Sequence, residues 1–426
     1  MPADTAFAAE ERIEHTFGIQ LITPMYGGGA RTGVNDPDFP VRPASVRGQL
    51  RFWWRATRGA KFETVKELHK RESEIWGKTD TPSSVVVRVK PSEWKERRPY
   101  VGPKDDNYGF KRFSPEGYVL FPATADTSRH DLVREGLAFE VSVSFAKSKD
   151  EDKEKGKKRD EALKKDIFCA VWAWVNFGGL GSRTRRGCGA LFCKELAPER
   201  AAKDSVSKWF RESVNEYGLE PGANRLWPTL SGRILAGSSS RGPGKEASLE
   251  AWKMAITPMK DFRQTPGIGR NNVNSATRRP GRSFWPEPDT LRREFGLHAQ
   301  NHAPSDDMPD GFPRAAFGLP IIFQFVGSRG DPSTELYPKG KRRMGSPLIL
   351  RPLNARDGGS LPVVVLLQSP MCEELELKNL VKTFGKESIV NKKFVKYRNS
   401  PMKNSTNGSA VEAFTAYLKT RSFEEV

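Results

Sequence analysis

The first half of the chain alternates apolar and polar residues over several short stretches, as β-strands do. The clearest stretch is 16–23, where Phe17, Ile19 and Leu21 fall on one face. The same alternation, or a short apolar run after a loop, predicts three more strands, at 84–89, 138–145 and 190–194.

Two segments with a helical period lie between these strands. The first spans 45–58, with Ser45 as its expected N-cap, and the second spans 161–177. The resulting order, β-α-β-β-α-β, is that of a ferredoxin-like (RRM-like) domain. The stretch 147–165 is dense in Lys, Asp and Glu, which favours a solvated, partly helical connector.

The second half of the chain also mixes predicted strands and helices, but with a less regular pattern. Strands are expected at 232–236, 316–326, 347–352 and 362–368, and helices at 249–262 and 409–419. We therefore expect an α+β protein whose first domain covers residues 1–205 and whose second, divergent α+β domain covers residues 206–426.

The charge balance points to an acidic partner. The chain has 426 residues and a formal net charge of +18, and nucleic acid is the commonest partner of a soluble chain with this balance. A purely solubilising excess of lysine is the alternative, but here arginines cluster with aromatic residues.

Cysteine spacing and hydropathy further restrict the class of protein to which the chain can belong. The four cysteines form no C-x-x-C pair and have no neighbouring histidines, so we expect neither a disulfide framework nor a metal site. The longest apolar runs, such as 362–367, are too short to span a bilayer, and the first residues lack the apolar stretch of a signal peptide. The expectation is a cytoplasmic protein without a membrane partner.

A glycine-rich loop at 178–189 directly follows the second predicted helix. Glycines allow close approach of a phosphodiester, and arginines supply forked donors that stay charged. The spacing fits neither the phosphate-binding loop of nucleotidases nor the dinucleotide fingerprint, and a flexible surface turn is the alternative. The residues expected to bind RNA are Gly178, Gly179, Gly181, Ser182, Arg183, Arg185 and Arg186.

Four arginines of the first predicted helix fall in one arc of the helical wheel: Arg47, Arg51, Arg55 and Arg58. Trp54 lies in the same arc and could stack on a base, whereas Trp53 lies in the apolar arc and is expected in the core. Surface pairing with carboxylates is the alternative, but residues 41–60 contain no Asp or Glu. The pattern favours RNA contact.

Two further segments have the composition of nucleic-acid-contacting loops. Residues 97–118 interleave Tyr and Phe with Lys and Arg, although packing against the domain explains this equally well. Residues 264–285 are expected to form a long mobile loop that orders on RNA. Its arginines are Arg270, Arg278, Arg279 and Arg282.

The motifs taken together resemble a known family. They are Thr-Pro-Met-Tyr-Gly-Gly-Gly at 23–29, Arg-Pro-Ala-Ser-Val-Arg-Gly-Gln-Leu-Arg-Phe-Trp-Trp-Arg-Ala at 42–56 and the glycine-rich loop, with agreeing segments at 284–287, 316–321 and 343–348. The chain is similar to the RAMP superfamily of CRISPR proteins, and within it to the first subunits of type III-B (Cmr) effector complexes.

The resemblance implies two ferredoxin-like domains with long loop insertions. It also implies a non-catalytic subunit without a cofactor, placed beside the 3′ (spacer) part of a guide RNA. The implied partners are guide RNA, target RNA and other RAMP subunits. Arg42, which opens the second motif, joins the expected RNA-binding residues.

A metal-independent endoribonuclease that processes guide-RNA precursors is the competing hypothesis. Such chemistry needs a general base beside a 2′-hydroxyl, and His15 or Tyr26 are the only candidates. None of the five histidines lies in a motif with a nucleophile. Asp36 and Asp38 flank Pro37 and are interpreted as turn residues.

Overall fold

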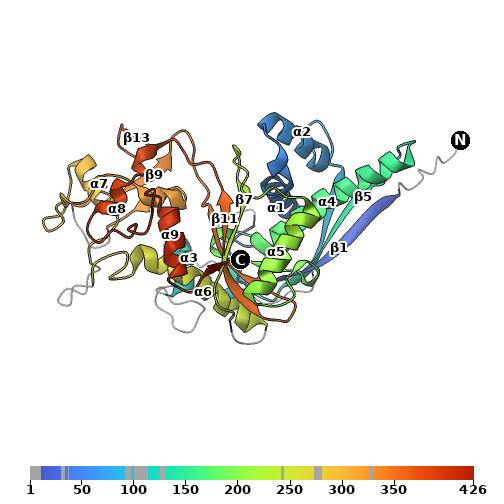
Figure 1. Cartoon of the computed structure of the whole chain (residues 1–426), viewed down its shortest axis with the longest axis horizontal. Helices are drawn as coiled ribbons and strands as arrows, with labels where there is room; N and C mark the ends of the chain where they lie inside the picture. Colours follow the sequence, from blue (N-terminus) through green and yellow to red (C-terminus); the bar gives the residue numbers. More distant parts are fainter. Residues whose placement is uncertain are drawn as a thin grey trace.

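Two four-stranded antiparallel sheets with the same strand order form the frame of the protein (Figure 1). The computed structural model describes residues 11–29, 34–36, 38–91, 97–99, 114–124, 131–240, 244–272, 281–325 and 330–426.

The first sheet has the order β2-β5-β1-β6, and its chain order is β1-α1-β2-β5-α4-β6. This is the ferredoxin-like arrangement, so the predicted order of the first domain is confirmed. The bounds are β1 Arg12–Leu21, α1 Pro43–Ala56, β2 Val85–Pro91, β5 Ala138–Ala146, α4 Lys153–Phe177 and β6 Leu191–Phe192.

The second sheet, β10-β11-β7-β14, repeats this topology as β7-α6-β10-β11-α9-β14. Both ferredoxin-like units are therefore present. The bounds are β7 Thr229–Ala236, α6 Lys245–Gln264, β10 Leu348–Asn354, β11 Ser360–Gln368, α9 Ala410–Lys419 and β14 Glu424–Glu425.

An accessory sheet with the order β13-β12-β9-β8 is inserted into the second unit. Its strands come from both connections of that unit, β8 and β9 before β10, and β12 and β13 after β11. The bounds are β8 Ile321–Phe323, β9 Thr334–Pro338, β12 Glu374–Leu377 and β13 Thr383–Gly385.

The remaining elements lie in connections, most of them within one of the two units. They are α2 Val65–Trp76, α3 Pro115–Thr124, α5 Lys203–Tyr217, α7 Glu287–Phe295 and α8 Lys393–Lys396, the 3₁₀ turns η1 Arg58–Lys61, η2 Thr184–Arg186, η3 Lys194–Leu196, η4 Pro313–Phe317 and η5 Lys386–Ser388, and the small pair β3 Arg97–Pro99 with β4 Asp131–Val133. The exceptions are η3 and α5, which lie between β6 of the first unit and β7 of the second.

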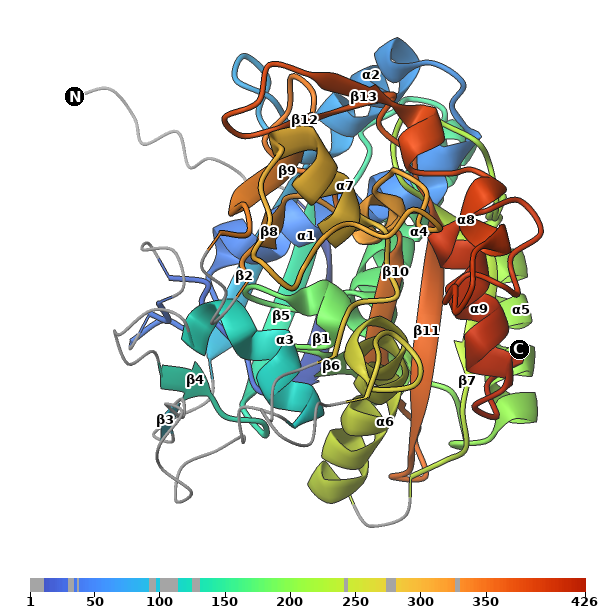
Figure 2. The same cartoon turned by 90° about the vertical axis from the view of Figure 1, so that its left-hand side faces the viewer.

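The strands β10 and β11 of the second sheet are buried on both faces. Ile349 and Val363 lie in a core shared with α1 and α4, whereas Leu350 and Val364 lie in a core shared with α6 and α9. Figure 2 shows α6 beside β10 and β11. Burial on both faces explains why β10 and β11 are almost continuously apolar while β1, with one solvated face, alternates.

Several predicted boundaries were wrong for local reasons. The helix α1 begins at Pro43, and Ser45 lies within it, because proline suits the first helical position. The helix α4 begins eight residues before position 161, capped by the Asp152 carboxylate, which accepts from the Glu154 N–H at 3.1 Å. The predicted strand 316–326 is instead the turn η4 followed by the short β8, and residue 326 lies outside the described residues.

The boundary between residues 205 and 206 stays a proposal. The helix α5 begins at Lys203 and packs its aromatic residues on α4 of the first unit. Trp172 lies 5.6 Å from Trp209 and 6.2 Å from Phe210 between ring centroids.

Trp54 is fully buried, at 0% exposure, so its prediction as a base-stacking surface was wrong. The predicted core position of Trp53, 2% exposed, is confirmed. The helix α1 is covered on both sides because α2 and η1 pack against it, as does α4; helical periodicity alone showed only one apolar arc.

We therefore expect Trp54→Ala to destabilise the fold by roughly 3 to 5 kcal/mol, the usual cost of truncating a buried tryptophan. Urea unfolding followed by circular dichroism would measure this. Trp53→Ala should cost a similar amount, and a cost for Trp54→Ala below about 0.5 kcal/mol, typical of a surface position, would contradict its buried position.

Candidate RNA-binding interface

The glycine-rich loop and the 23–29 segment form one hydrogen-bonded body. The Ser182 N–H donates to the Tyr26 carbonyl at 2.6 Å, and the Gly189 N–H donates to the Pro24 carbonyl at 2.9 Å. The Thr23 hydroxyl donates to the Gly187 carbonyl at 2.6 Å. Two motifs that are about 150 residues apart in sequence thus meet at the carboxyl end of β1.

Arg351 of β10 anchors this loop from the second unit. Its guanidinium, 0% exposed, donates to the carbonyls of Gly178 at 2.7 Å and Leu191 at 2.8 Å. Burial lowers the pKa of Arg351 to about 9, so the group is still charged at neutral pH. Carbonyl oxygens on both sides of the loop therefore stabilise a buried cation.

Arg186 makes the reciprocal contact, from the loop to the second unit. It donates to the carbonyls of Leu348 at 3.1 Å and Phe317 at 3.3 Å, and to the Ser346 hydroxyl at 3.2 Å. Burial lowers its pKa to about 10. Arg186 was expected to bind RNA, but these acceptors within the protein occupy its donors.

The side chain of Arg185 is half-buried. It donates to the Ser346 carbonyl, and its guanidinium lies 5.5 Å from the ring centroid of Phe52 on α1. Burial lowers its pKa to about 10. Arg185 therefore joins the loop to both units while part of its side chain stays accessible.

Two glycines of the loop are required by close packing. Gly187 has φ +78°, and a Cβ there would lie 2.6 Å from the Trp252 indole. Gly181 has φ +76°, and a Cβ would lie 2.7 Å from the Gly27 carbonyl oxygen. Both glycines are needed for the fold of the loop, whatever approaches it from outside.

Arg183 is the exposed arginine of the loop, and its φ of 65° is uncommon for a residue with a Cβ. Loss of hydration is the main cause that lowers its pKa; the nearby Cys188, Tyr26 and Tyr118 act against this, and the like charge of Arg343 adds a smaller lowering. Among the described residues, neither Arg183 nor Arg343 has a carboxylate within ion-pair distance. An anion placed between them would relieve this repulsion.

The arginines of α1 are partly engaged by neighbouring helices. Arg51 donates to the buried Glu72 carboxylate of α2 at 2.8 Å, and Arg55 lies 3.7 Å from it. Arg58, which lies in η1 just after α1, pairs at 2.9 Å with Asp166 of α4, which is 3% exposed. The absence of acids in 41–60 was therefore misleading, because the partners come from other helices.

Arg47 donates to the Trp76 carbonyl of α2. Arg51 and Arg55 remain about a third exposed, at 35% and 39%. Whether this row contacts RNA stays a prediction, and Arg58, 13% exposed, has the least accessible side chain of the three paired arginines.

Arg42 has a structural position. Its guanidinium donates to the Gly28 carbonyl at 2.6 Å and the Gly29 carbonyl at 3.3 Å, so it shapes the turn before α1. In the same turn the Asp36 carboxylate accepts the N–H groups of Asp38 and Phe39 at 3.0 and 2.9 Å. Asp36 is thus a turn residue, as interpreted from the sequence.

The segment predicted as a mobile loop is ordered at both ends. Arg270 is bridged to Ser283, and Arg282 pairs at 2.6 Å with the buried Asp289 of α7. Arg278 and Arg279 lie outside the described residues, as does most of the 97–118 segment.

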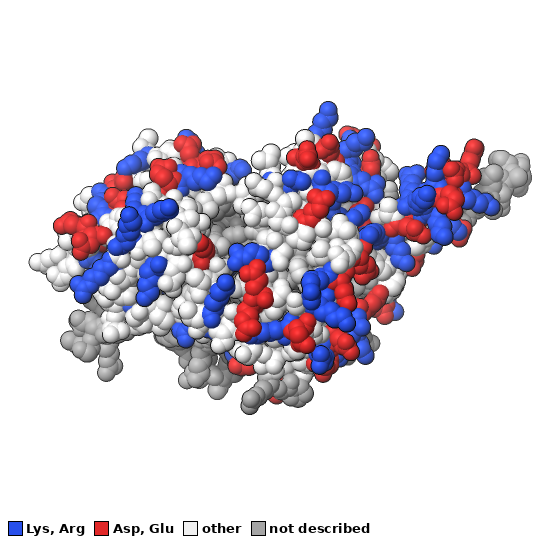
Figure 3. Space-filling model, viewed as in Figure 1, with Lys and Arg blue, Asp and Glu red and all other residues white. Residues whose placement is uncertain are grey.

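Charge on the surface is not segregated on the face seen in Figure 3. Lys and Arg lie intermingled with Asp and Glu over that face. The net charge of the chain therefore does not by itself locate a nucleic-acid site, and individual unpaired arginines become more informative.

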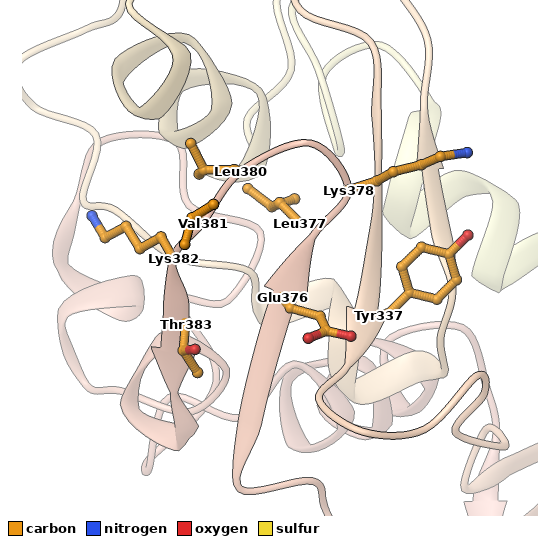
Figure 4. A pocket seen from close by; sticks show the side chains of 8 residues that line it. All are labelled: Tyr337, Glu376, Leu377, Lys378, Leu380, Val381, Lys382 and Thr383. Atoms are coloured by element: carbon orange, nitrogen blue, oxygen red, sulfur yellow. The ribbon is translucent and has the colours of Figure 1, made fainter.

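The accessory sheet carries a separate cavity of about 390 Å³, shown in Figure 4. Its cations are already paired: Lys382 with Glu294 at 2.6 Å, and Lys378 with Glu335 at 3.2 Å. This pairing makes the cavity a poorer polyanion site than the surroundings of Arg183.

Other classes of site find little support in the described residues. They contain no group of three or more His, Cys, Asp or Glu side chains placed to hold a metal ion. Nor do they contain a helix with the length and apolarity needed to cross a membrane. Cys169, Cys188 and Cys193 are buried free thiols, and Cys372 is a half-buried one.

His15 and Tyr26 do not share a site. The His15 ring packs 4.5 Å from Phe17 and pairs at 2.9 Å with Glu195. Tyr26 lies beyond the other end of β1, beside Ser182. His15 and Leu21 are six residues apart in this strand, about 20 Å at the rise of a β-strand.

Comparisons with known proteins agree on one family. The model of the RAMP superfamily matches residues 19–192, which include α1 and the glycine-rich loop. The CRISPR system Cmr subunit Cmr1-2 of Pyrococcus furiosus is 30% identical over 192 residues, covering 42% of this chain and 94% of the relative. Subunit Cmr1-1 of the same organism is 28% identical over 152 residues, 35% of this chain and 40% of the relative.

A solved structure matches over nearly the whole length. The crystal structure of Cmr1 from Pyrococcus furiosus in its apo form has a TM-score of 0.51 and 16% identity, and covers 97% of this chain and 98% of that chain. At this identity the match concerns the fold.

Arg186 and Arg183 should differ in their effect on stability. We expect Arg186→Ala to lower the free energy of unfolding by roughly 1.5 to 3 kcal/mol, since it removes charge-assisted hydrogen bonds between the units. Arg183→Ala, at an exposed position, should change it by less than about 0.5 kcal/mol. Denaturant titration of both variants would measure this, and equal losses would show that the two arginines have the same structural role.

Proposed function

We propose that the chain is an RNA-binding subunit of a type III-B effector complex. The proposal starts from its family: the chain belongs to the RAMP superfamily and, within it, to the Cmr1 subunits of CRISPR Cmr systems. It contacts the guide RNA and the guide–target duplex near the 3′ (spacer) end of the guide, beside other RAMP subunits. In this proposal the chain acts in the cytoplasm in RNA-guided antiviral interference. Base pairing between guide and target recognises the sequence, while the protein recognises the shape of the RNA and contacts its phosphates.

The observation that carries this proposal is the position of Arg183, which is exposed on the loop and lies near the like charge of Arg343. Neither arginine has a carboxylate within ion-pair distance among the described residues, and two neighbouring cations without such a partner favour a phosphate beside them. Arg183 is held by a loop that both units brace, so the donor is positioned before the ligand arrives. Preorganisation of this kind reduces the entropic cost of binding.

The salt dependence of RNA binding tests these contacts. If Arg183 and Arg343 each neutralise one phosphate, R183A/R343A should bind single-stranded RNA with a salt slope shallower by about 0.7 log units per contact, or roughly 1.4 in total. Titrations of fluorescently labelled RNA at several salt concentrations would measure the slope.

A matched control removes the same charge elsewhere. Lys208 and Arg211 are exposed on α5, and K208A/R211A should leave the slope unchanged if α5 lies outside the interface. A slope unchanged in R183A/R343A as well would place the phosphate contacts elsewhere, with Arg51 and Arg55 as the next candidates.

We propose that the chain binds RNA without cleaving it. Incubation of the pure chain with a repeat-containing transcript in chelator should leave the transcript intact. A discrete cut that His15→Ala abolishes would refute this part of the proposal and favour the endoribonuclease. A cut that persists in His15→Ala would point either to a contaminating nuclease or to another general base. Tyr26→Phe distinguishes these two explanations, since it abolishes the cut only if Tyr26 is the base.

A further inference from the structure

A small cavity opens where the glycine-rich loop meets α1 and β10. Its volume is about 160 Å³, well below the 300 to 1,000 Å³ typical of sites for drug-sized ligands. It is lined by Gln49, Phe52 and Trp53 of α1, by Phe177, Gly178, Thr184 and Arg185 around the loop, and by Ile349 of β10.

The lining combines flat apolar surfaces with a few polar groups. Phe52 and Trp53 meet edge to face at 5.3 Å between ring centroids, and Arg185 lies over the Phe52 ring. No acceptor for the Trp53 indole N–H, and no partner for the Gln49 amide, is found among the described residues. Gln49 can donate and accept at the same time, as the edge of a nucleobase requires.

From these features we infer that the cavity binds one unpaired nucleobase of the bound RNA. This inference rests on the proposed function, since it needs RNA at the adjacent Arg183. The base would enter beside Phe52 and Arg185 and present its edge to Gln49 and the Trp53 N–H. Aromatic side chains and arginine planes are the usual partners of bases splayed out of single-stranded RNA.

The location supports a base over other small planar ligands. Thr184 and Arg185, which line the cavity, directly follow Arg183 in the chain. An RNA backbone held at Arg183 would therefore pass within reach of the opening. The site lies between the two units and is anchored by contacts of Arg185 to both, so its walls are fixed before RNA binds.

Oligonucleotides that differ only in the presence of one base can test base binding in the cavity separately from the phosphate contacts. We would compare an abasic ribose–phosphate oligonucleotide with the same oligonucleotide carrying one central base, uracil in one series and adenine in another. The full-length chain should bind the single-base oligonucleotide more tightly by roughly 5- to 150-fold, the usual range for stacking of one base on an aromatic residue.

Phe52→Leu should abolish this gain and leave affinity for the abasic oligonucleotide unchanged, because leucine preserves apolar packing but offers no ring for stacking. Phe62→Leu is the matched control. Phe62 is also half-buried, lies 6.1 Å from a buried tryptophan, Trp54, and has Lys61 5.2 Å above its ring. It should retain the full gain.

The outcomes separate the two proposals. If the native chain binds intact RNA, and binds the abasic and the single-base oligonucleotide with equal affinity, base binding in the cavity is refuted and the proposed function stands. If neither intact RNA nor the oligonucleotides bind, the proposed function itself fails. A gain that Phe52→Leu retains would place base stacking outside this cavity, and Gln49→Ala, which changes no packed ring, would repeat the test should Phe52→Leu not fold.

Discussion

The exchange of arginines between the two ferredoxin-like units is the contact on which the rest of this structure depends. Arg351 reaches from the second sheet to the Gly178 and Leu191 carbonyls beside the two ends of the glycine-rich loop, and Arg186 reaches back to Ser346 and to Leu348, the first residue of β10. Among the described residues neither guanidinium has a carboxylate partner, and removing a guanidinium from water is costly unless its donors are satisfied. Backbone carbonyls of the opposite unit satisfy them, so each unit completes the polar contacts of the other.

This exchange also explains the layering. With the units locked together, the second sheet lies between α1 and α4 of one unit and α6 and α9 of its own. In this position β10 and β11 expose neither face, so they carry no polar alternation. At the junction of the units, Arg183, Arg343 and the cavity beside Phe52 lie close together in the fold.

Elements with a clear period could be predicted from the sequence, whereas contacts between distant elements could not. Phe17, Ile19 and Leu21 fall on the buried face of β1 as alternation indicates. Trp54 was misplaced because a helical wheel shows one helix and not the helices packed on its second face. Arg51 and Arg58 seemed free because Glu72 and Asp166 are distant in sequence. The accessory sheet was missed as a unit since its strands are short and come from two separate insertions.

The same reasoning limits what net charge can indicate about RNA binding. The chain has a formal charge of +18, yet the guanidinium groups of Arg58, Arg186 and Arg351 are held by acceptors within the protein. A glycine- and arginine-rich motif can therefore be required first by the fold, with only its outward residue left for the ligand. A single stacked base beside that residue would add affinity that does not weaken with salt as ion pairs do.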